Sequence, residues 1–132
     1  MLVSKCLYEK KGEVKTFKII DAGMNELVRP AMYEGYHEIV NVKQPVGNTA
    51  SLDVVGPICE SSDVFCKSLE LENFDEGDYV ALMSAGAYGF VMASNYNTRG
   101  YPAEVLVDGG EAKVVRPRQS VDELLAGEID CL

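Results

Sequence analysis

Hydrophobic and polar residues alternate in short runs along most of the chain, a period of two that is typical of β-strands. Two of these runs, 2–9 and 14–21, flank the polar break Lys10-Lys11-Gly12-Glu13 and predict a hairpin. Further strands are predicted at 36–42, 50–55, 79–83 and 89–93, and at 103–108 and 111–116 around Gly109-Gly110. About eight short strands predict a mainly β fold, built as a barrel or a sandwich.

Helical signals are confined to two places, a turn after Asp63 and the end of the chain. Ser120 precedes the run 121–126, Glu123 follows Ser120 by three residues, and Gly127 comes after the run. This spacing fits a capping box and predicts a short C-terminal helix. Because no repeat, low-complexity segment or linker interrupts the pattern, we expect one β-domain over residues 1–132.

Composition narrows the classes of partner. The hydrophobic share of 47% is enough for a core, and 12 Lys and Arg against 21 Asp and Glu give a net charge of -9. Such a charge disfavours nucleic acid and anionic membranes, and with only 8% aromatic residues an oligonucleotide-binding barrel is disfavoured too. No run approaches the roughly 20 apolar residues of a membrane span, and the first residues lack a signal peptide's apolar run. We therefore expect a cytoplasmic protein.

The cysteines do not form a metal-binding pattern. Cys6, Cys59, Cys66 and Cys131 occur without a C-x-x-C pair, and His37 is the only histidine. We expect reduced thiols and no metal.

Three loops carry polar groups that a plain β-barrel does not require. In the first, the run 21–25 leads to Arg29-Pro30 and to Tyr33, four residues after the arginine. Pro30 restricts Arg29 toward extended geometry, which aims a guanidinium at a planar anion such as a carboxylate. The alternative is an ordinary surface arginine beside a turn.

The second loop follows the strand that Gly56-Pro57 ends, and it places Cys59 and Glu60 near the strand end. A thiol is mostly protonated near neutral pH and can donate a proton, and a nearby carboxylate favours that form. Without a histidine in reach, an acid is a better role for Cys59 than a nucleophile. The alternative is a buried cysteine that packs as a small hydrophobe while Asp63 caps the next turn.

The third loop, 84–89, surrounds Tyr88 with small residues. Glycines let a ligand approach closely, and a phenol can donate to a phosphate or carboxylate oxygen. A barrel corner with a packing tyrosine is the alternative.

Taken together, the order and separation of these motifs resemble the C-terminal β-domain of the diaminopimelate decarboxylases. The matching motifs are Asp-Ala-Gly-Met-Asn at 21–25, Arg-Pro-Ala-Met-Tyr at 29–33, Cys-Glu-Ser-Ser-Asp at 59–63, Gly-Ala-Tyr-Gly at 86–89 and Ser-Asn-Tyr-Asn-x-Arg at 94–99. The resemblance runs from about Leu2 to the terminal helix. Related ornithine decarboxylases usually follow the cysteine with Asp-Gly, so Glu60-Ser61 points to the diaminopimelate branch.

The resemblance implies a Greek-key β-barrel or sandwich like the C-terminal domain of alanine racemase and the group IV decarboxylases. In that family a separate β/α barrel holds pyridoxal phosphate on a lysine, and this sequence lacks that N-terminal barrel. The implied reaction converts meso-2,6-diaminopimelate to L-lysine and carbon dioxide, with the cofactor barrel and a second subunit of a homodimer as partners. We expect this chain alone to hold no cofactor and to be inactive; a non-catalytic binding or assembly module derived from the family is the alternative.

The resemblance also implies residue roles. Arg29 and Tyr33 would hold a substrate carboxylate, Glu60 the distal ammonium, and Tyr88 both the cofactor phosphate and the substrate, while Cys59 would be the catalytic proton donor. Two positions depart from the family's pattern: Ser62 stands where glycine is usual, and Gly100-Tyr101 replaces the usual Arg or Pro.

Overall fold

The computed structural model describes residues 1–43 and 47–128, and the chain divides into two compact units, Met1–Ala93 and Ser94–Leu132. The first unit carries the three motif loops. Cys131 lies outside the described residues. Within the described part, no helix is both long and apolar enough to cross a membrane.

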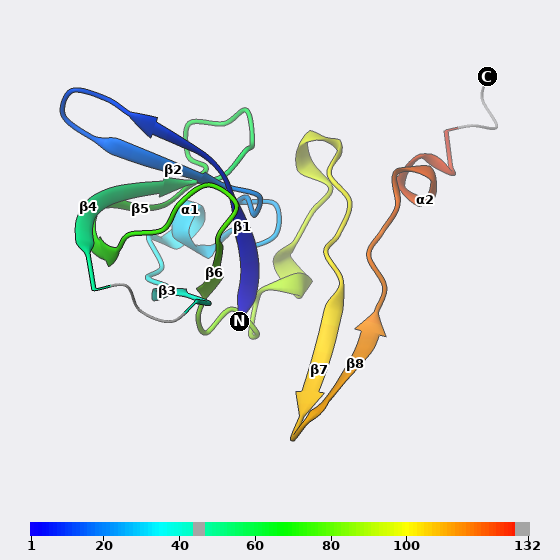
Figure 1. The fold of residues 1–132 in the computed structure, drawn as a ribbon. Helices are drawn as coiled ribbons and strands as arrows, with labels where there is room; N and C mark the ends of the chain where they lie inside the picture. The colour runs from blue at the N-terminus through cyan, green and yellow to red at the C-terminus, as the bar shows by residue number, and fades with distance from the viewer. Residues whose placement is uncertain (44–46, 129–132) are drawn as a thin grey trace. The chain divides into compact units, whose positions relative to one another are not determined.

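One nearly closed sheet makes up the first unit (Figure 1). Its strands follow the order β3-β6-β1-β2-β4-β5, and the two edge strands, β3 and β5, also touch. All paired neighbours run antiparallel except β2 and β4, which run parallel. The strands are β1 (Leu2–Lys11), β2 (Thr16–Ile20), β3 (Ile39–Asn41), β4 (Thr49–Val55), β5 (Val64–Glu72) and β6 (Tyr79–Leu82).

The core lies on one face of this sheet. In β1, Ser4 and Cys6 point inward while Val3 and Lys5 are exposed, as the period of two predicts. Inward-facing apolar side chains from all six strands form the buried cluster, which includes Cys6, Ile20, Leu52, Val54, Val80 and Leu82. Lys18 of β2 is fully buried as well, with its ammonium bound to Glu9 and to the carbonyl of Phe74.

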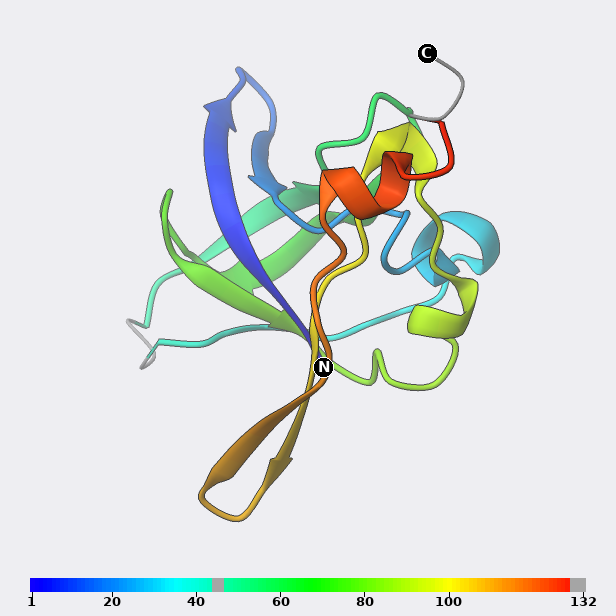
Figure 2. The same ribbon diagram turned by 90° about the vertical axis from the view of Figure 1, so that its right-hand side faces the viewer.

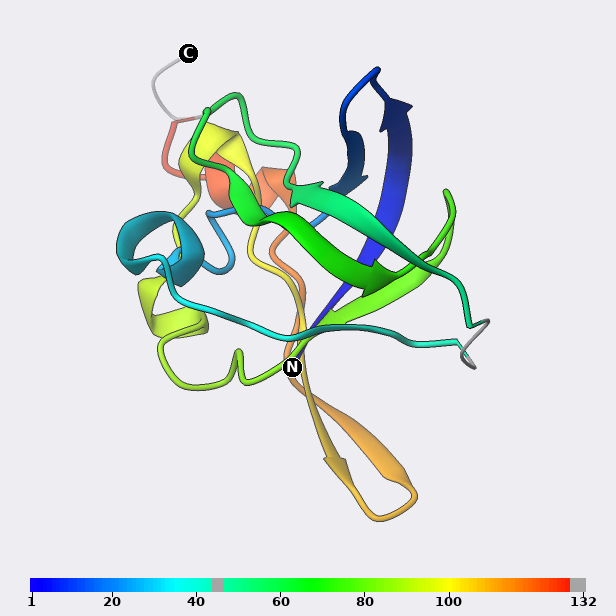
Figure 3. The same cartoon turned by 90° about the vertical axis from the view of Figure 1, so that its left-hand side faces the viewer.

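Strand direction decides where the loops emerge. Because β1 runs antiparallel to both β2 and β6, and β2 runs parallel to β4, the strands β2, β4 and β6 all point the same way. Their carboxyl ends therefore lie at one end of the sheet. Figure 3 shows α1 (Arg29–Tyr33), the 56–63 loop and the segment after β6 gathered on that side.

The mainly β fold of about eight strands is confirmed, as is the first hairpin, in which β1 pairs with β2. The prediction of a strand at 89–93 is wrong: Phe90–Met92 is a 3₁₀ turn, η1, and no strand of the described sheet pairs with it. The expected helical turn after Asp63 is wrong too, because β5 begins at Val64. Polar residues interrupt the alternation in β5, so its sequence pattern is weak; the strand is also irregular at Ser68, which takes a φ of 48°.

The second unit contains β7 (Glu104–Asp108), β8 (Glu111–Arg116), the 3₁₀ turn η2 (Tyr96–Thr98) and α2 (Val121–Leu125). β7 and β8 form a two-stranded antiparallel ribbon (Figure 2), in which Gly109 takes a φ of 57° in the turn. The Gln119 side chain accepts hydrogen bonds from the Asn95 amide and the Tyr101 backbone N–H. The predicted capping box between Ser120 and Glu123 is confirmed.

Candidate functional site

The five side chains predicted to act on a ligand all belong to segments that follow β2, β4 or β6. Arg29 and Tyr33 lie on α1 beyond β2, Cys59 and Glu60 in the loop after β4, and Tyr88 in the loop after β6. All three segments begin at the same end of the sheet because their strands are codirectional.

α1 is a single helical turn, which corrects the expectation that Arg29 is extended. Pro30 lies in the first turn of the helix, where backbone N–H groups have no partner within the helix. Proline therefore loses no hydrogen bond there, and its fixed φ suits the helical conformation. Glu34 ends the turn with a φ of 55°, and its N–H donates to the Pro30 carbonyl. Since Arg29 and Tyr33 are four residues apart, they share one face of the turn. Tyr33 is 60% exposed and Arg29 is half-buried.

The loop after β4 presents Cys59 to solvent, so the alternative of a buried packing thiol is wrong for this residue. Beside it, the Glu60 carboxylate accepts the Ser62 N–H and the Ser61 hydroxyl, each at 3.3 Å. These bonds, the Ser62 N–H first, lower the pKa of Glu60 and favour its charged form. Cys66 lies half-buried in β5, and burial raises the pKa of its thiol, in keeping with a packing role.

Asp63 connects this loop to the one before α1. Its Oδ1 accepts the Met24 N–H at 2.7 Å and its Oδ2 accepts the Ile58 N–H at 2.8 Å. Asp63 is buried. The motif that leads to Arg29 is therefore joined directly to the motif that carries Cys59. Sequence reasoning gave Asp63 only a local capping role, because its partner Met24 is 39 residues away.

Tyr88 occupies a tightly turned loop. Tyr88 itself has a φ of 59° and Ser84 a φ of 56°, a region that bulky residues rarely adopt. A Cβ on Gly89 would lie 2.2 Å from the Ala85 carbonyl oxygen, so only glycine fits there. The Tyr88 side chain is 64% exposed. The interpretation of Tyr88 as a packing tyrosine is therefore disfavoured.

The start of the Tyr88 loop is attached to the segment that follows α1. His37 Nδ1 lies 2.8 Å from the Met83 carbonyl, and the Met83 N–H donates to the Glu38 carbonyl. The carbonyl can only accept, so Nδ1 carries a proton in this contact. The loop after β6 thus begins beside the connection between α1 and β3.

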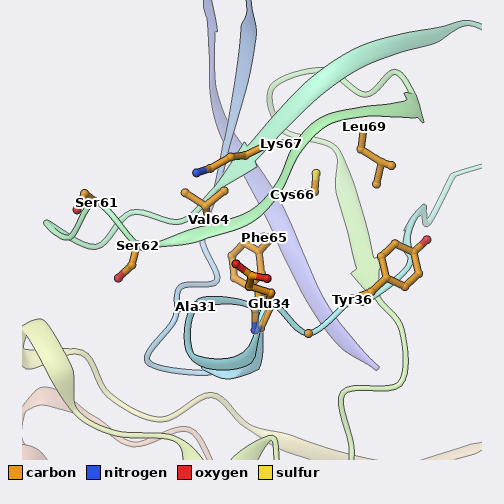
Figure 4. Close-up of a pocket in the computed structure, with 12 residues that line it drawn as sticks. Ala31, Glu34, Tyr36, Ser61, Ser62, Val64, Phe65, Cys66, Lys67 and Leu69 are labelled. Atoms are coloured by element: carbon orange, nitrogen blue, oxygen red, sulfur yellow. The ribbon is translucent and has the colours of Figure 1, made fainter.

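A pocket of about 480 Å³ opens between α1 and β5 (Figure 4). The predicted site residues do not line it; their chain neighbours do, among them Pro30, Ala31 and Glu34 on one side and Ser61 and Ser62 on the other. Sequence reasoning missed this pocket because its β5 wall, which includes Phe65, Cys66 and Lys67, was not predicted as a strand.

Among the residues that the structure describes, no group of three or more His, Cys, Asp or Glu is arranged to hold a metal. The predicted site residues in the loops at this end of the sheet instead offer one guanidinium, one thiol, one carboxylate and two phenols. This set can bind anionic and cationic groups and can donate protons.

The first unit is a mainly β domain whose polar motif loops begin at one end of its sheet, and loops held on a rigid scaffold carry binding and catalytic residues disproportionately often. Residues 1–86 match the family described as "Pyridoxal-dependent decarboxylase, C-terminal sheet domain". The chain therefore belongs to this family.

Within this family, the chain is similar to diaminopimelate decarboxylases. Diaminopimelate decarboxylase from Pseudomonas fluorescens is 52% identical over 128 residues, which cover 97% of this chain and 30% of the relative. The crystal structure of AQ1208 from Aquifex aeolicus matches with a TM-score of 0.94 at 42% identity, covering 98% of this chain and 32% of that one. Diaminopimelate decarboxylase from Helicobacter pylori, solved in complex with L-lysine, gives a TM-score of 0.91 at 40% identity and covers 99% and 32%. The chain thus spans about 30% of the length of these relatives.

Proposed function

We propose that this chain serves as the C-terminal sheet domain of a diaminopimelate decarboxylase, which converts meso-2,6-diaminopimelate to L-lysine and carbon dioxide. The observation that carries the proposal is the common origin of the three motif loops at one end of the sheet, with two of them joined through Asp63. The similarity to decarboxylases over 97% of the chain supports the same conclusion.

Substrate recognition rests on charge. Arg29 and Tyr33, on one face of α1, suit a carboxylate, because a guanidinium and a phenol both donate to its oxygens. Glu60 suits the distal ammonium, and its lowered pKa keeps it charged in mildly acidic solution. A charged contact at the distal end would separate diaminopimelate from substrates that lack the second amino acid centre.

The residues in the loops at this end of the sheet fit pyridoxal phosphate only in part. Tyr88 suits the phosphate group, since its exposed phenol is free to donate to an anion. The three loops and α1 contain no lysine, so the lysine that holds the cofactor would come from another part of the enzyme. If the cofactor were bound there, it would supply an electron sink for the decarboxylation, while the residues of this chain would bind the substrate and return a proton.

Cys59 would supply the proton that replaces the lost carboxylate. Its thiol is exposed, and a protonated thiol can donate to carbon and then recover a proton from solvent. His37, the sole histidine, is buried and bonded to Met83. This arrangement favours an acid over an activated nucleophile.

The remaining parts of the enzyme would be a pyridoxal-phosphate barrel and a second subunit, giving a homodimer in the cytoplasm. The relatives are about three times as long as this chain, which leaves room for such a barrel.

The test is reconstitution. This chain alone, with pyridoxal phosphate, is expected to release no carbon dioxide from meso-diaminopimelate. Mixing it with a polypeptide that carries the rest of the Pseudomonas fluorescens relative is expected to restore turnover, and Cys59→Ser should lower that turnover about 10²- to 10⁴-fold. Turnover by the chain alone would refute the proposal, and a stable but inactive complex would favour a non-catalytic assembly module.

A further inference from the structure

Asp63 is a buried carboxylate that binds two loops at once. Only 4% of it is exposed, and its oxygens lie 2.7 Å from the Met24 nitrogen and 2.8 Å from the Ile58 nitrogen. Burying an ionised carboxylate is unfavourable unless hydrogen bonds compensate it, and two backbone donors provide that compensation here. Both oxygens act as acceptors, a pattern that an amide side chain cannot reproduce.

The 56–63 loop is closed around this carboxylate. The Gly56 N–H donates to the Asp63 carbonyl, and the Asp63 N–H donates to the Glu60 carbonyl. A Cβ on Gly56 would lie 2.2 Å from Asp63 Oδ2, so glycine is required for the carboxylate to occupy its place. Cys59 and Glu60 lie inside the closed loop, and their position therefore depends on Asp63.

The second partner belongs to the segment that starts α1. Met24 lies in a compact turn in which the Glu26 and Leu27 N–H groups donate to the Gly23 carbonyl. The same turn packs against the other loop, since a Cβ on Gly23 would lie 2.7 Å from the Ile58 side chain. Because Val28 and Arg29 follow this turn directly, its position sets where α1 begins.

We propose that Asp63 is a positioning residue that fixes Cys59 and Glu60 relative to Arg29 and Tyr33. The importance of this spacing for turnover rests on the proposed function, whereas the link between the loops does not. An error of about 1 Å between such groups is enough to reduce a rate about 100-fold.

The experiment compares the full 132-residue chain with Asp63→Asn and with Gly56→Ala, which displaces the same carboxylate from the other side. By NMR, the Met24 and Ile58 amides are expected to exchange with solvent about tenfold faster, or more, in both variants, because each loses a bond to a charged acceptor. The pKa of Glu60 is expected to rise toward its ordinary value, since the bonds that lower it depend on the loop. Gly86→Ala is the matched control, because a Cβ there meets nothing within 4 Å.

The alkylation rates of two cysteines distinguish a general loss of stability from a local change in the loop. Alkylation followed by mass spectrometry is expected to show an altered rate at Cys59 and an unchanged rate at the buried Cys6. Unchanged exchange at Met24 together with an unchanged pKa of Glu60 would overturn the proposal, as would equal acceleration at Cys6 and Cys59. In the reconstituted enzyme, Asp63→Asn should lower kcat more than it raises KM. Failure of reconstitution would refute the proposed function and leave the exchange results as a separate test of the loop link.

Discussion

The buried Lys18 provides a quantitative test of how the sheet is stabilised. Its ammonium is bound to the Glu9 carboxylate and the Phe74 carbonyl, and lies 5.3 Å from the centre of the Phe74 ring. Glu9 and Lys18 are directly opposite each other on β1 and β2. The substitution Glu9→Gln removes the negative charge and leaves the ammonium buried.

We expect Glu9→Gln to lower the free energy of unfolding by about 3 kcal/mol, the lower end of the range for removing one partner of a buried ion pair. The lower end applies because the Glu9 side chain is 19% exposed and because the Phe74 carbonyl and ring still face the ammonium. With a typical urea dependence for a small domain, the unfolding midpoint should fall by about 1–3 M.

The effect should depend on pH with a definite sign. The hydrogen bond from Lys18 is the main cause that lowers the pKa of Glu9 in the folded protein. A lowered pKa gives stability that is present above the unfolded-state pKa and is lost as the pH falls through the folded-state pKa. The difference in the free energy of unfolding between wild type and Glu9→Gln should therefore have its full size at about pH 7 and become smaller toward about pH 3.

Urea unfolding followed by circular dichroism at both pH values measures this difference. Lys11→Gln is the control, because Lys11 contacts the same carboxylate at 2.9 Å from a side chain that is 75% exposed; little change is expected. Equal midpoints for wild type and Glu9→Gln near neutral pH, or a difference that stays constant on acidification, would refute the reasoning.

Two further substitutions test loop and helix geometry. Gly89→Ala places a Cβ 2.2 Å from the Ala85 carbonyl and should change backbone chemical shifts throughout the loop 84–89, whereas Gly86→Ala should change only those of residues 85–87; perturbations confined to the neighbours of the replaced residue in both variants would contradict this. Ser120→Ala removes the acceptor of the Glu123 N–H and should weaken α2 by about 1 kcal/mol, seen as faster amide exchange at Glu123, and unaltered exchange would contradict the capping role.

Much of the fold and of the candidate site was predictable from local patterns. Alternation identified β1 and β2, the Gly109-Gly110 turn identified the second hairpin, and Ser120 with Glu123 identified the start of α2. These features depend on residues a few positions apart, so the sequence carries them directly. The sequence motifs of the three loops likewise identified the candidate site residues, whose roles remain predictions: Arg29, Tyr33, Cys59, Glu60 and Tyr88.

Only the tertiary structure determined strand pairing, burial and the contacts between residues that are far apart in the chain. The parallel pairing of β2 with β4 brings two motif loops to the same end, and β5 forms although its polar residues give a weak strand signal. Lys18 is buried because Glu9 and Phe74 surround its ammonium, and Asp63 binds Met24 across 39 residues. Local sequence sets the conformations open to each segment, whereas strand order and burial are set by which distant partners satisfy their charges and hydrogen bonds.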